Sequence, residues 1–318
     1  MGRKFIISVG GGRSQLSLIK AIHEAGYGCV AFDKNPEAEG RREADYFFLC
    51  STHDFKQAIH RLQTCQHKWQ AVMVKAAGYP VISAAHIAQN LHLDFIAPEV
   101  AKSLIWKDTL IHYARKNQIP VPESFVRFYI EEIPEEFFPA VLRPNQDISG
   151  RWSTVFLKRK DGLFRYFEGY PKTQVTEYTL SQYIPGYDIA LVTVFDLAQK
   201  DIRGVWLREY NQFTQKGTIN FGGIKPLKAV KMDIRVKAAQ IVDKILQRCG
   251  ATRGFMSFSF RVGSDDTVYL IEVHPDLGGE GVIDELLPAH LQRPFLKDLV
   301  RFCAGDLPRI DYLPYAFQ

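Results

Sequence analysis

Residues 254–279 read GFMSFSFRVGSDDTVYLIEVHPDLGG, and this stretch decides the fold. It holds two β-runs in succession, 255–262 and 267–273, which favour neighbouring strands of an antiparallel sheet. Glu272 and His274 stand two positions apart on the second run, so their side chains face the same way. A carboxylate and an imidazole are therefore presented together, directly before a turn that ends in two glycines.

The segments before this stretch also consist of predicted β-runs separated by turns, together with one long helix. A long amphipathic helix is predicted over about 230–249, with Gly250 as its C-cap. Earlier β-runs, separated by turns, are predicted at 140–143, 153–158, 164–168, 189–195 and 203–210. The second half of the chain is therefore predicted as α+β with antiparallel sheets.

The first hundred residues follow a different pattern, in which strands and helices alternate. Short apolar β-runs are predicted at 5–9, 29–32, 46–49 and 71–74. Helices are predicted between them, from Ser14 as N-cap to Gly26, at 54–63 and at 83–92. Such alternation implies a parallel sheet with helices on both faces. A seam near 98–108 and a helix at 107–117 lead into the second half.

Composition excludes several classes of protein. The chain has 318 residues, 46% of them hydrophobic and 24% charged, with a formal net charge of +5. This small, dispersed excess argues against nucleic-acid binding, and no apolar run reaches the ~18–20 residues of a membrane-spanning helix. The N-terminal apolar stretch is too short for a signal peptide. Five cysteines without Cys-x-x-Cys spacing favour reduced thiols. We therefore expect a cytoplasmic protein with no nucleic-acid or membrane partner.

A glycine turn, Gly10–Gly12, follows the first strand, where a helix N-terminus can bind phosphate. The dinucleotide fingerprint Gly-x-Gly-x-x-Gly fails at its third glycine, which is Gln15 here, although Asp33 stands where a ribose-binding acid would. A dehydrogenase is therefore disfavoured. A tight structural turn and a substrate-binding crevice at the strand ends both stay open. No Walker A pattern occurs in the sequence.

Four segments of the second half fall in a fixed order. They are Trp106-Lys107-Asp108, Ala140–Pro144, Gln182–Asp188 and the stretch 254–279. Their order and spacing together resemble the ATP-grasp superfamily. The phrase Leu-Arg-Pro within the second segment resembles the carboxylate–amine ligase and carbamoyl-phosphate-synthase branches of that superfamily.

The resemblance implies a domain organisation and an activity. An α/β N-terminal parallel-sheet domain at 1–100 is followed by an α+β ATP-grasp fold at 101–318, divided into a small central lobe at 101–177 and a C-terminal lobe at 178–318. The implied activity is that of an ATP-dependent ligase, which converts a carboxylate to an acyl phosphate that an amine then attacks. Small-molecule acids and amines would be its partners, and a homodimer is compatible with it.

The same resemblance assigns nucleotide-binding roles. Lys107 and Arg143 match the basic residues that hold the α- and β-phosphates in the family. ATP carries about four negative charges, so its site needs such fixed cations. Arg143 offers bidentate contact to a phosphate. The remaining nucleotide matches are Gln182, Tyr183 and Ile184 for adenine, Ser149 and Gly150 for the phosphate loop, and Asp188 for ribose, with a turn carboxylate as the alternative. Catalytic positions at the γ-phosphate or acceptor fall on Arg208 and Lys216.

The metal ligands depart from the family pattern. The candidate ligands of an ATP-bound Mg²⁺, or of Mn²⁺ in its place, are Glu272, His274 and Asp276. Ser259 stands where members carry an acid or amide, and His274 where they carry asparagine. Mg²⁺ prefers oxygen ligands, so His274 is a poor one. Two hypotheses stay open: an active ligase whose Mg²⁺ is held through Glu272 and Asp276 with more waters, or an ATP-binding sensor or partner subunit with weakened or lost ligase chemistry.

Overall fold

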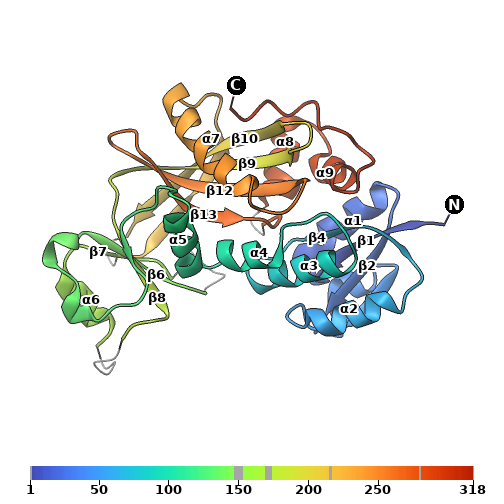
Figure 1. Cartoon of the computed structure of the whole chain (residues 1–318), viewed down its shortest axis with the longest axis horizontal. Coiled ribbons are helices and arrows are strands. Elements are labelled where there is room, and N and C mark those ends of the chain that lie inside the picture. The colour runs from blue at the N-terminus through green and yellow to red at the C-terminus, as the bar shows by residue number, and fades with distance from the viewer. Residues whose placement is uncertain (1, 147–152, 169–173, 215–216, 279–280, 318) are drawn as a thin grey trace.

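The computed structural model describes residues 2–146, 153–168, 174–214, 217–278 and 281–317. These residues form three β-sheets (Figure 1). One four-stranded sheet is built from the first hundred residues, and the other two, of four and five strands, come from the rest of the chain. Three residues with predicted roles lie outside the described residues, namely Ser149 and Gly150 of the predicted phosphate loop and Lys216, predicted as catalytic.

The N-terminal sheet is parallel, as predicted, with strand order β3-β2-β1-β4. Its strands are β1 (Lys4–Val9), β2 (Gly28–Asp33), β3 (Tyr46–Leu49) and β4 (Lys68–Val74). Its helices are α1 (Leu16–Glu24), α2 (Phe55–Gln63) and α3 (Tyr79–Asn90). The central strands are almost wholly buried because uncharged runs can be covered by helices on both faces.

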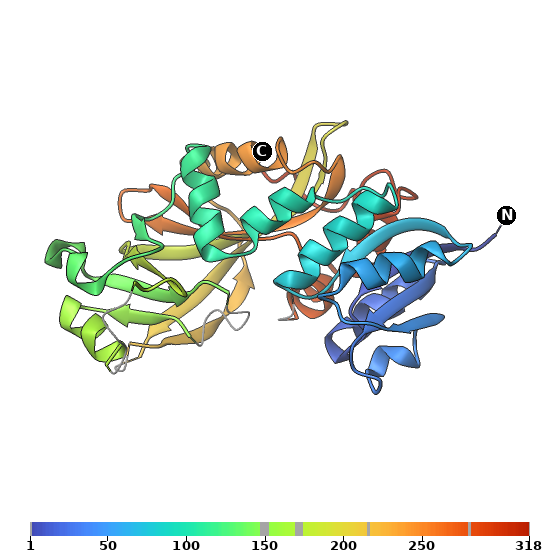
Figure 2. The same ribbon diagram turned by 60° about the horizontal axis from the view of Figure 1, so that its bottom comes forward.

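Two helices lead from this sheet to the small antiparallel sheet, α4 (Pro98–Leu104) and α5 (Lys107–Lys116). In Figure 2 the teal helices run across the molecule between the two sheets. The small sheet has the order β5-β8-β6-β7 and consists of β5 (Ser124–Phe125), β6 (Ala140–Pro144), β7 (Val155–Leu157) and β8 (Tyr178–Gln182). β8 thus belongs to this sheet, although the predicted lobe boundary stands at residue 178, and the domain boundaries stay predictions.

One predicted strand, 164–168, is wrong. Residues Lys160–Tyr166 form helix α6, in which Leu163 is buried and Arg165 pairs with Asp161 one turn earlier at 3.0 Å. The ion pair joins residues four apart, which lie on one face of a helix. The short aromatic run, by contrast, suggests the period of two that is typical of a strand.

The large sheet is antiparallel and five-stranded, in the order β11-β10-β9-β12-β13. Its strands are β9 (Gly186–Asp196), β10 (Asp201–Phe213), β11 (Ile219–Pro226), β12 (Arg253–Gly263) and β13 (Val268–His274). Helix α7 (Met232–Leu246) packs through Ile241 and Ile245 on the face that carries Leu191 and Trp206. The opposite face carries Ala190, Val192 and Leu207 and belongs to a different core cluster. Strand parity therefore decides which residues can reach a site on that second face.

The end of the chain returns to the N-terminal sheet. A π-helical turn at Val282–Leu286 leads into α8 (Leu287–Leu291) and α9 (Phe295–Cys303), and α9 lies beside α1 (Figure 1). The side-chain amide of Gln70 donates to the Ala304 carbonyl at 2.8 Å, and Lys4 Nζ lies 3.1 Å from a carboxylate oxygen of Asp306. Among the described residues no helix combines the length and the apolar character that crossing a bilayer needs.

Candidate active site

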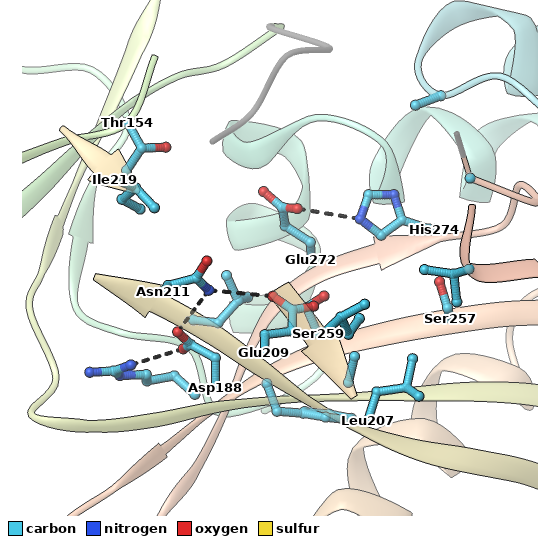
Figure 3. A pocket seen from close by; sticks show the side chains of 18 of the residues that line it. Thr154, Asp188, Leu207, Glu209, Asn211, Ile219, Ser257, Ser259, Glu272 and His274 are labelled. Carbon is cyan, nitrogen blue, oxygen red and sulfur yellow. Dashed lines mark hydrogen bonds and ion pairs between the residues drawn. The ribbon is translucent and has the colours of Figure 1, made fainter. Parts of the chain in front are cut away.

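A cavity of about 1060 Å³ lies over the second face of the large sheet. Residues of all three sheets or of the segments that follow them line it, among them Arg143, Asp188, Glu272 and Lys75. Figure 3 shows the side chains from β9, β10, β12 and β13 directed into this cavity. The cavity therefore brings together segments that lie far apart in the sequence, from Ser14 to Ile283.

Two buried cations face one carboxylate at the end of the cavity where the sequence predicts the phosphates of ATP, which we call the phosphate end. Lys107 begins α5 and Arg143 lies near the end of β6, and the two elements meet where the Lys107 N–H donates to the Asn145 carbonyl at 3.4 Å. Glu272 Oε1 lies 3.7 Å from Lys107 Nζ and 3.9 Å from Arg143 Nη1. Arg143 Nε is buried and has no hydrogen-bond partner among the described residues. Such an orphaned donor on a buried cation fits an anion that binds there.

The charge of Glu272 depends on its neighbours. Burial by itself would raise the pKa of this carboxyl, but the His274 imidazole, the Lys107 ammonium and the Arg143 guanidinium lower it well below the usual range. Glu272 is therefore an anion at neutral pH and holds the two cations in place.

The predicted adenine-reading segment follows β8. The Gln182 N–H donates to the Glu123 carbonyl at 2.8 Å and the Tyr183 N–H to the Pro139 carbonyl at 2.9 Å. The Ile184 carbonyl accepts a hydrogen bond from Arg261 Nε at 2.8 Å. The segment lines the cavity and is fixed by these bonds rather than free to move.

Asp188 also lines the cavity, inside a polar network that the sequence did not reveal. Its carboxylate oxygens accept from Arg261 Nη1 and from the Asn211 side-chain amide, both at 3.0 Å (Figure 3). Asn211 also reaches Glu209 at 3.4 Å. Glu209 and Asn211 stand two apart on β10, so a pair of polar residues at strand spacing was the available signal.

Arg208 lies away from the cavity, contrary to its predicted place beside the γ-phosphate or acceptor. Its guanidinium stacks on the Tyr187 ring at 4.1 Å, while Leu207 and Glu209 line the cavity. The reason is strand parity, because Arg208 points to the same side as Trp206, toward the α7 face.

The candidate metal ligands form a line along one strand end. His274 Nε2 lies 3.3 Å from Glu272 Oε2, and its Nδ1 lies 3.8 Å from Asp276 Oδ2. Burial would lower the pKa of His274, but the Asp276 and Glu272 carboxylates raise it to about 10. Ser259 is the direct neighbour of Glu272 on β12. In the part of the chain that the structure describes, no group of three Asp, Glu, His or Cys side chains lies close enough to hold a metal ion.

In the glycine turn Gly10–Gly12, two backbone N–H groups donate hydrogen bonds to side chains of the protein. The Gly11 N–H donates to Asp33 Oδ2 at 3.2 Å and the Gly12 N–H to Gln15 Oε1 at 3.1 Å. Gln15 is buried and also donates to the Lys75 carbonyl at 2.6 Å. Two donors that a phosphate would need are therefore occupied, which supports the structural interpretation of this turn. Ser14, predicted as an N-cap, makes no capping bond to α1.

Comparison with known proteins gives a likeness in structure. No protein-family model matches the chain, and no curated protein matches its sequence. A phosphoribosylglycinamide synthetase from Anaerococcus prevotii matches with a TM-score of 0.71 and 18% identity, over 96% of this chain and 76% of that one. An L-amino acid ligase from Bacillus licheniformis matches with a TM-score of 0.74 and 16% identity, over 96% of this chain and 75% of that one. An N5-carboxyaminoimidazole synthetase from Staphylococcus aureus complexed with ADP matches with a TM-score of 0.73 and 14% identity, over 99% of this chain and 80% of that one.

Proposed function

We propose that this chain, which has the fold of the ATP-grasp superfamily, is an ATP-dependent ligase that activates a carboxylate for attack by an amine. One observation carries the proposal: buried Arg143, whose Nε has no partner among the described residues, lines a cavity together with Glu272 and the Gln182–Ile184 segment. Lys107 and Arg143 both lie within 4 Å of the Glu272 carboxylate, at 3.7 and 3.9 Å. Fixed cations at one end and an apolar cradle at the other suit a nucleoside triphosphate.

The nucleotide would lie along this cavity. Tyr183 and Ile184 offer apolar walls to adenine, and Asp188, held by Arg261 and Asn211, accepts hydrogen bonds from ribose hydroxyls. Arg143 and Lys107 would then hold the phosphates. The Staphylococcus aureus synthetase of the same fold is complexed with ADP, which supports a nucleotide as the ligand of this fold.

A divalent metal fits with few protein ligands. Glu272 is the carboxylate at the phosphate end, and Mg²⁺ commonly binds through one or two carboxylates together with nucleotide phosphates and water. His274 sits between two carboxylates as an imidazolium, so it supplies positive charge rather than a ligand. We propose that Mg²⁺, or Mn²⁺ in its place, binds with ATP at Glu272 and offsets phosphate charge there. Asp276, which accepts from the Gly278 N–H at 2.8 Å, orients His274.

The reaction has two steps. A carboxylate oxygen attacks the γ-phosphorus, the bond from that phosphorus to the β-bridging oxygen breaks, and ADP leaves. An amine then attacks the acyl carbon, phosphate leaves, and the amine loses a proton. Arg143 and Lys107 neutralise the oxygens that carry charge in the first step. Small-molecule acids and amines as substrates, a cytoplasmic location where ATP is available, and compatibility with a homodimer belong to the same proposal.

Calorimetric titration with ATP, in the presence and absence of Mg²⁺, tests the nucleotide site. We expect binding that Arg143→Met abolishes or weakens strongly, and that Lys34→Met, a change at an exposed lysine, leaves unchanged. Absence of ATP binding would refute the proposal. Tighter binding of NADH than of ATP would instead support a dehydrogenase.

Release of ADP and phosphate, measured over pairs of carboxylic acids and amines, tests the chemistry. We expect turnover that requires both an acid and an amine. ATP binding with no turnover for any pair would favour the sensor or partner subunit over the ligase.

A further inference from the structure

The cavity contains a buried lysine that the nucleotide site does not use. Lys75 directly follows β4, lines the cavity and is 3% exposed. A lysine is almost never fully buried unless its ammonium is paired. The carboxyl ends of parallel strands are also where α/β folds bind ligands.

The ammonium of Lys75 is only partly satisfied. Within the described residues its ion-pair partner is Asp284, whose Oδ2 lies 3.0 Å from Lys75 Nζ and also accepts from the Ser17 hydroxyl at 2.8 Å. Burial would raise the pKa of Asp284, but the Ser17 hydroxyl and the Lys75 ammonium lower it, so Asp284 is an anion at neutral pH. An ammonium has three N–H donors, and one carboxylate oxygen does not use them all.

Lys75 lies next to the segment that follows the strand of Glu272 and His274. The Leu277 N–H donates to the carbonyl of Val74, the residue before Lys75, at 3.0 Å. Leu277 in turn follows Asp276, which pairs with His274. A substrate held at Lys75 would therefore lie alongside the segment that carries the phosphate-end residues.

The surroundings of Lys75 define what could bind. The lining residues that are close in sequence to Lys75 or Asp284 are apolar, namely Ala76, Ala77, Pro80, Val282 and Ile283, and the polar side chains of Ser14 and His53 also line the cavity. In the neighbouring glycine turn, the N–H groups of Gly11 and Gly12 already donate to Asp33 and Gln15. The positive charge for an anion here would therefore come from Lys75, whose charge Asp284 already balances. Such a site suits a monoanionic carboxylate, whereas a phosphate dianion calls for several cations, as at Lys107 and Arg143.

We propose that Lys75 binds the carboxylate of a small aliphatic acid or amino acid, which is a substrate of the ligase. This inference rests on the proposed function and names the substrate class for it. Lys75 acts as a specificity-determining residue, and Asp284, which accepts from the Ser17 hydroxyl, balances its charge.

Matched acids and amides test the carboxylate site, first without a nucleotide and then with ADP. The probes are propanoate with propanamide, L-alanine with L-alaninamide, and inorganic phosphate, each titrated by calorimetry in the absence and presence of ADP. We expect the protein to bind an acid at least tenfold more tightly than its amide. Lys75→Met should remove this preference, and Lys34→Met should keep it.

The Asp284→Asn variant separates binding from folding. It removes the counter-charge and keeps the ammonium, so acids should bind as tightly as before or more tightly. If Lys75→Met fails to fold, as judged by circular dichroism, the neutral pair Lys75→Met/Asp284→Asn replaces it. Equal binding of acids and amides, no binding of any acid at millimolar concentration, or equal losses in Lys75→Met and Asp284→Asn would overturn the proposal.

Two further outcomes distinguish this inference from the proposed function. Tighter binding of phosphate than of any acid would identify a phosphate site and overturn the carboxylate proposal. Lys75-dependent binding of acids by a protein that does not bind ATP would refute the ligase and leave the carboxylate site standing. Turnover of ATP that Lys75→Met leaves unchanged would refute the carboxylate site at Lys75 and leave the ligase proposal standing.

Discussion

Two arginines that the sequence assigns to the ATP site have different surroundings in the structure. Arg143 is buried, lines the cavity and has an Nε without a partner among the described residues. Arg208 lies on the other face of its sheet and stacks on Tyr187. The first has a donor left for a ligand, whereas the second already has a partner.

Replacing each arginine by methionine should therefore change the Kd for ATP to very different extents. Arg143→Met removes a charged donor to a phosphate, a loss of about 1.5–3 kcal/mol, which is roughly a ten- to hundredfold rise in the Kd for ATP. Arg208→Met should leave the Kd within about twofold, because only a contact between two protein side chains is lost. Calorimetry on both variants checks this. A larger effect at Arg208 than at Arg143 would restore the role that the sequence predicted for Arg208.

His274 should set the metal requirement of the reaction. In the structure its imidazole lies against Glu272, so it competes with a cation for a carboxylate oxygen. His274→Asn removes that competition and supplies an oxygen ligand. The Mg²⁺ concentration for half-maximal turnover should fall several-fold, with His112→Asn on the exposed face of α5 as the control. An unchanged or higher Mg²⁺ requirement would mean that His274 does not limit the metal site.

The sequence could predict residues whose neighbours in the chain mark them. Arg143 comes directly before a proline and a polar turn, and Glu272 stands in a strand that ends in a recognisable turn. Arg208, Glu209 and Asn211 lie on one long strand with a bulge between Tyr210 and Asn211. Which of two adjacent residues faces the cavity then depends on register, and register is fixed by partner strands that are distant in sequence.

At the scale of elements, one glycine joins the Gln182–Ile184 segment, which is predicted to bind adenine, to the large sheet. Gly186 begins β9 with φ +151° and pairs with Gly263 of β12. A Cβ there would lie 1.9 Å from the Val262 carbonyl oxygen. The close approach of two backbones therefore fixes where the segment leaves the sheet.

Gly186→Ala should displace the segment and damage two properties together. The clash and the unfavourable φ cost about 1–3 kcal/mol or more, so Tm should fall, and the Kd for ATP should rise about tenfold or more. Gly162→Ala in α6 is the control, because its Cβ would meet a leucine side chain at 3.3 Å and alanine favours helix. Thermal melts and calorimetry measure both. A fall in Tm with unchanged ATP affinity would show that the segment does not depend on this junction.

Elements with a clear period were predictable, and the others were not. The four strands of the N-terminal sheet are continuous apolar runs and were found. β11 was missed because paired glycines, Gly222 and Gly223, interrupt it, and glycine is depleted in strands. α6 was taken for a strand because its aromatic residues have strand propensity and it spans only two turns.

At the scale of the whole molecule, the first hundred residues are tied to the last forty. Ile6 and Cys29 share a core cluster with Val192 of the large sheet and Phe295 of α9. Local pattern cannot reveal such a contact, because its two sides lie nearly 300 residues apart. Lys75 of the first part and Ile283 of the last both line the cavity, so its shape depends on the contacts that join these parts.

Two carboxylates at this junction make it sensitive to acid. Asp306 accepts a hydrogen bond from the Tyr27 hydroxyl and pairs with Lys4, and these contacts lower its pKa. The pKa of Asp284 is lowered as well. A carboxyl whose folded-state pKa is below its unfolded value of ~3.9 stabilises the protein above that pH, and the contribution disappears as the pH falls through the folded-state pKa. The free energy of unfolding should therefore drop below about pH 4.

Asp306→Asn isolates part of this effect. At pH 6 the variant should be less stable than the natural chain in urea unfolding, because the amide neither attracts Lys4 nor accepts as strongly from Tyr27. The difference should shrink as the pH falls below about 4, where Asp306 itself becomes protonated and loses the same charge. Asp161→Asn, in an exposed ion pair on α6, should follow the natural chain at every pH. A difference that stays constant with pH would mean that Asp306 acts through packing, and the acid sensitivity of the junction would then need another carboxylate.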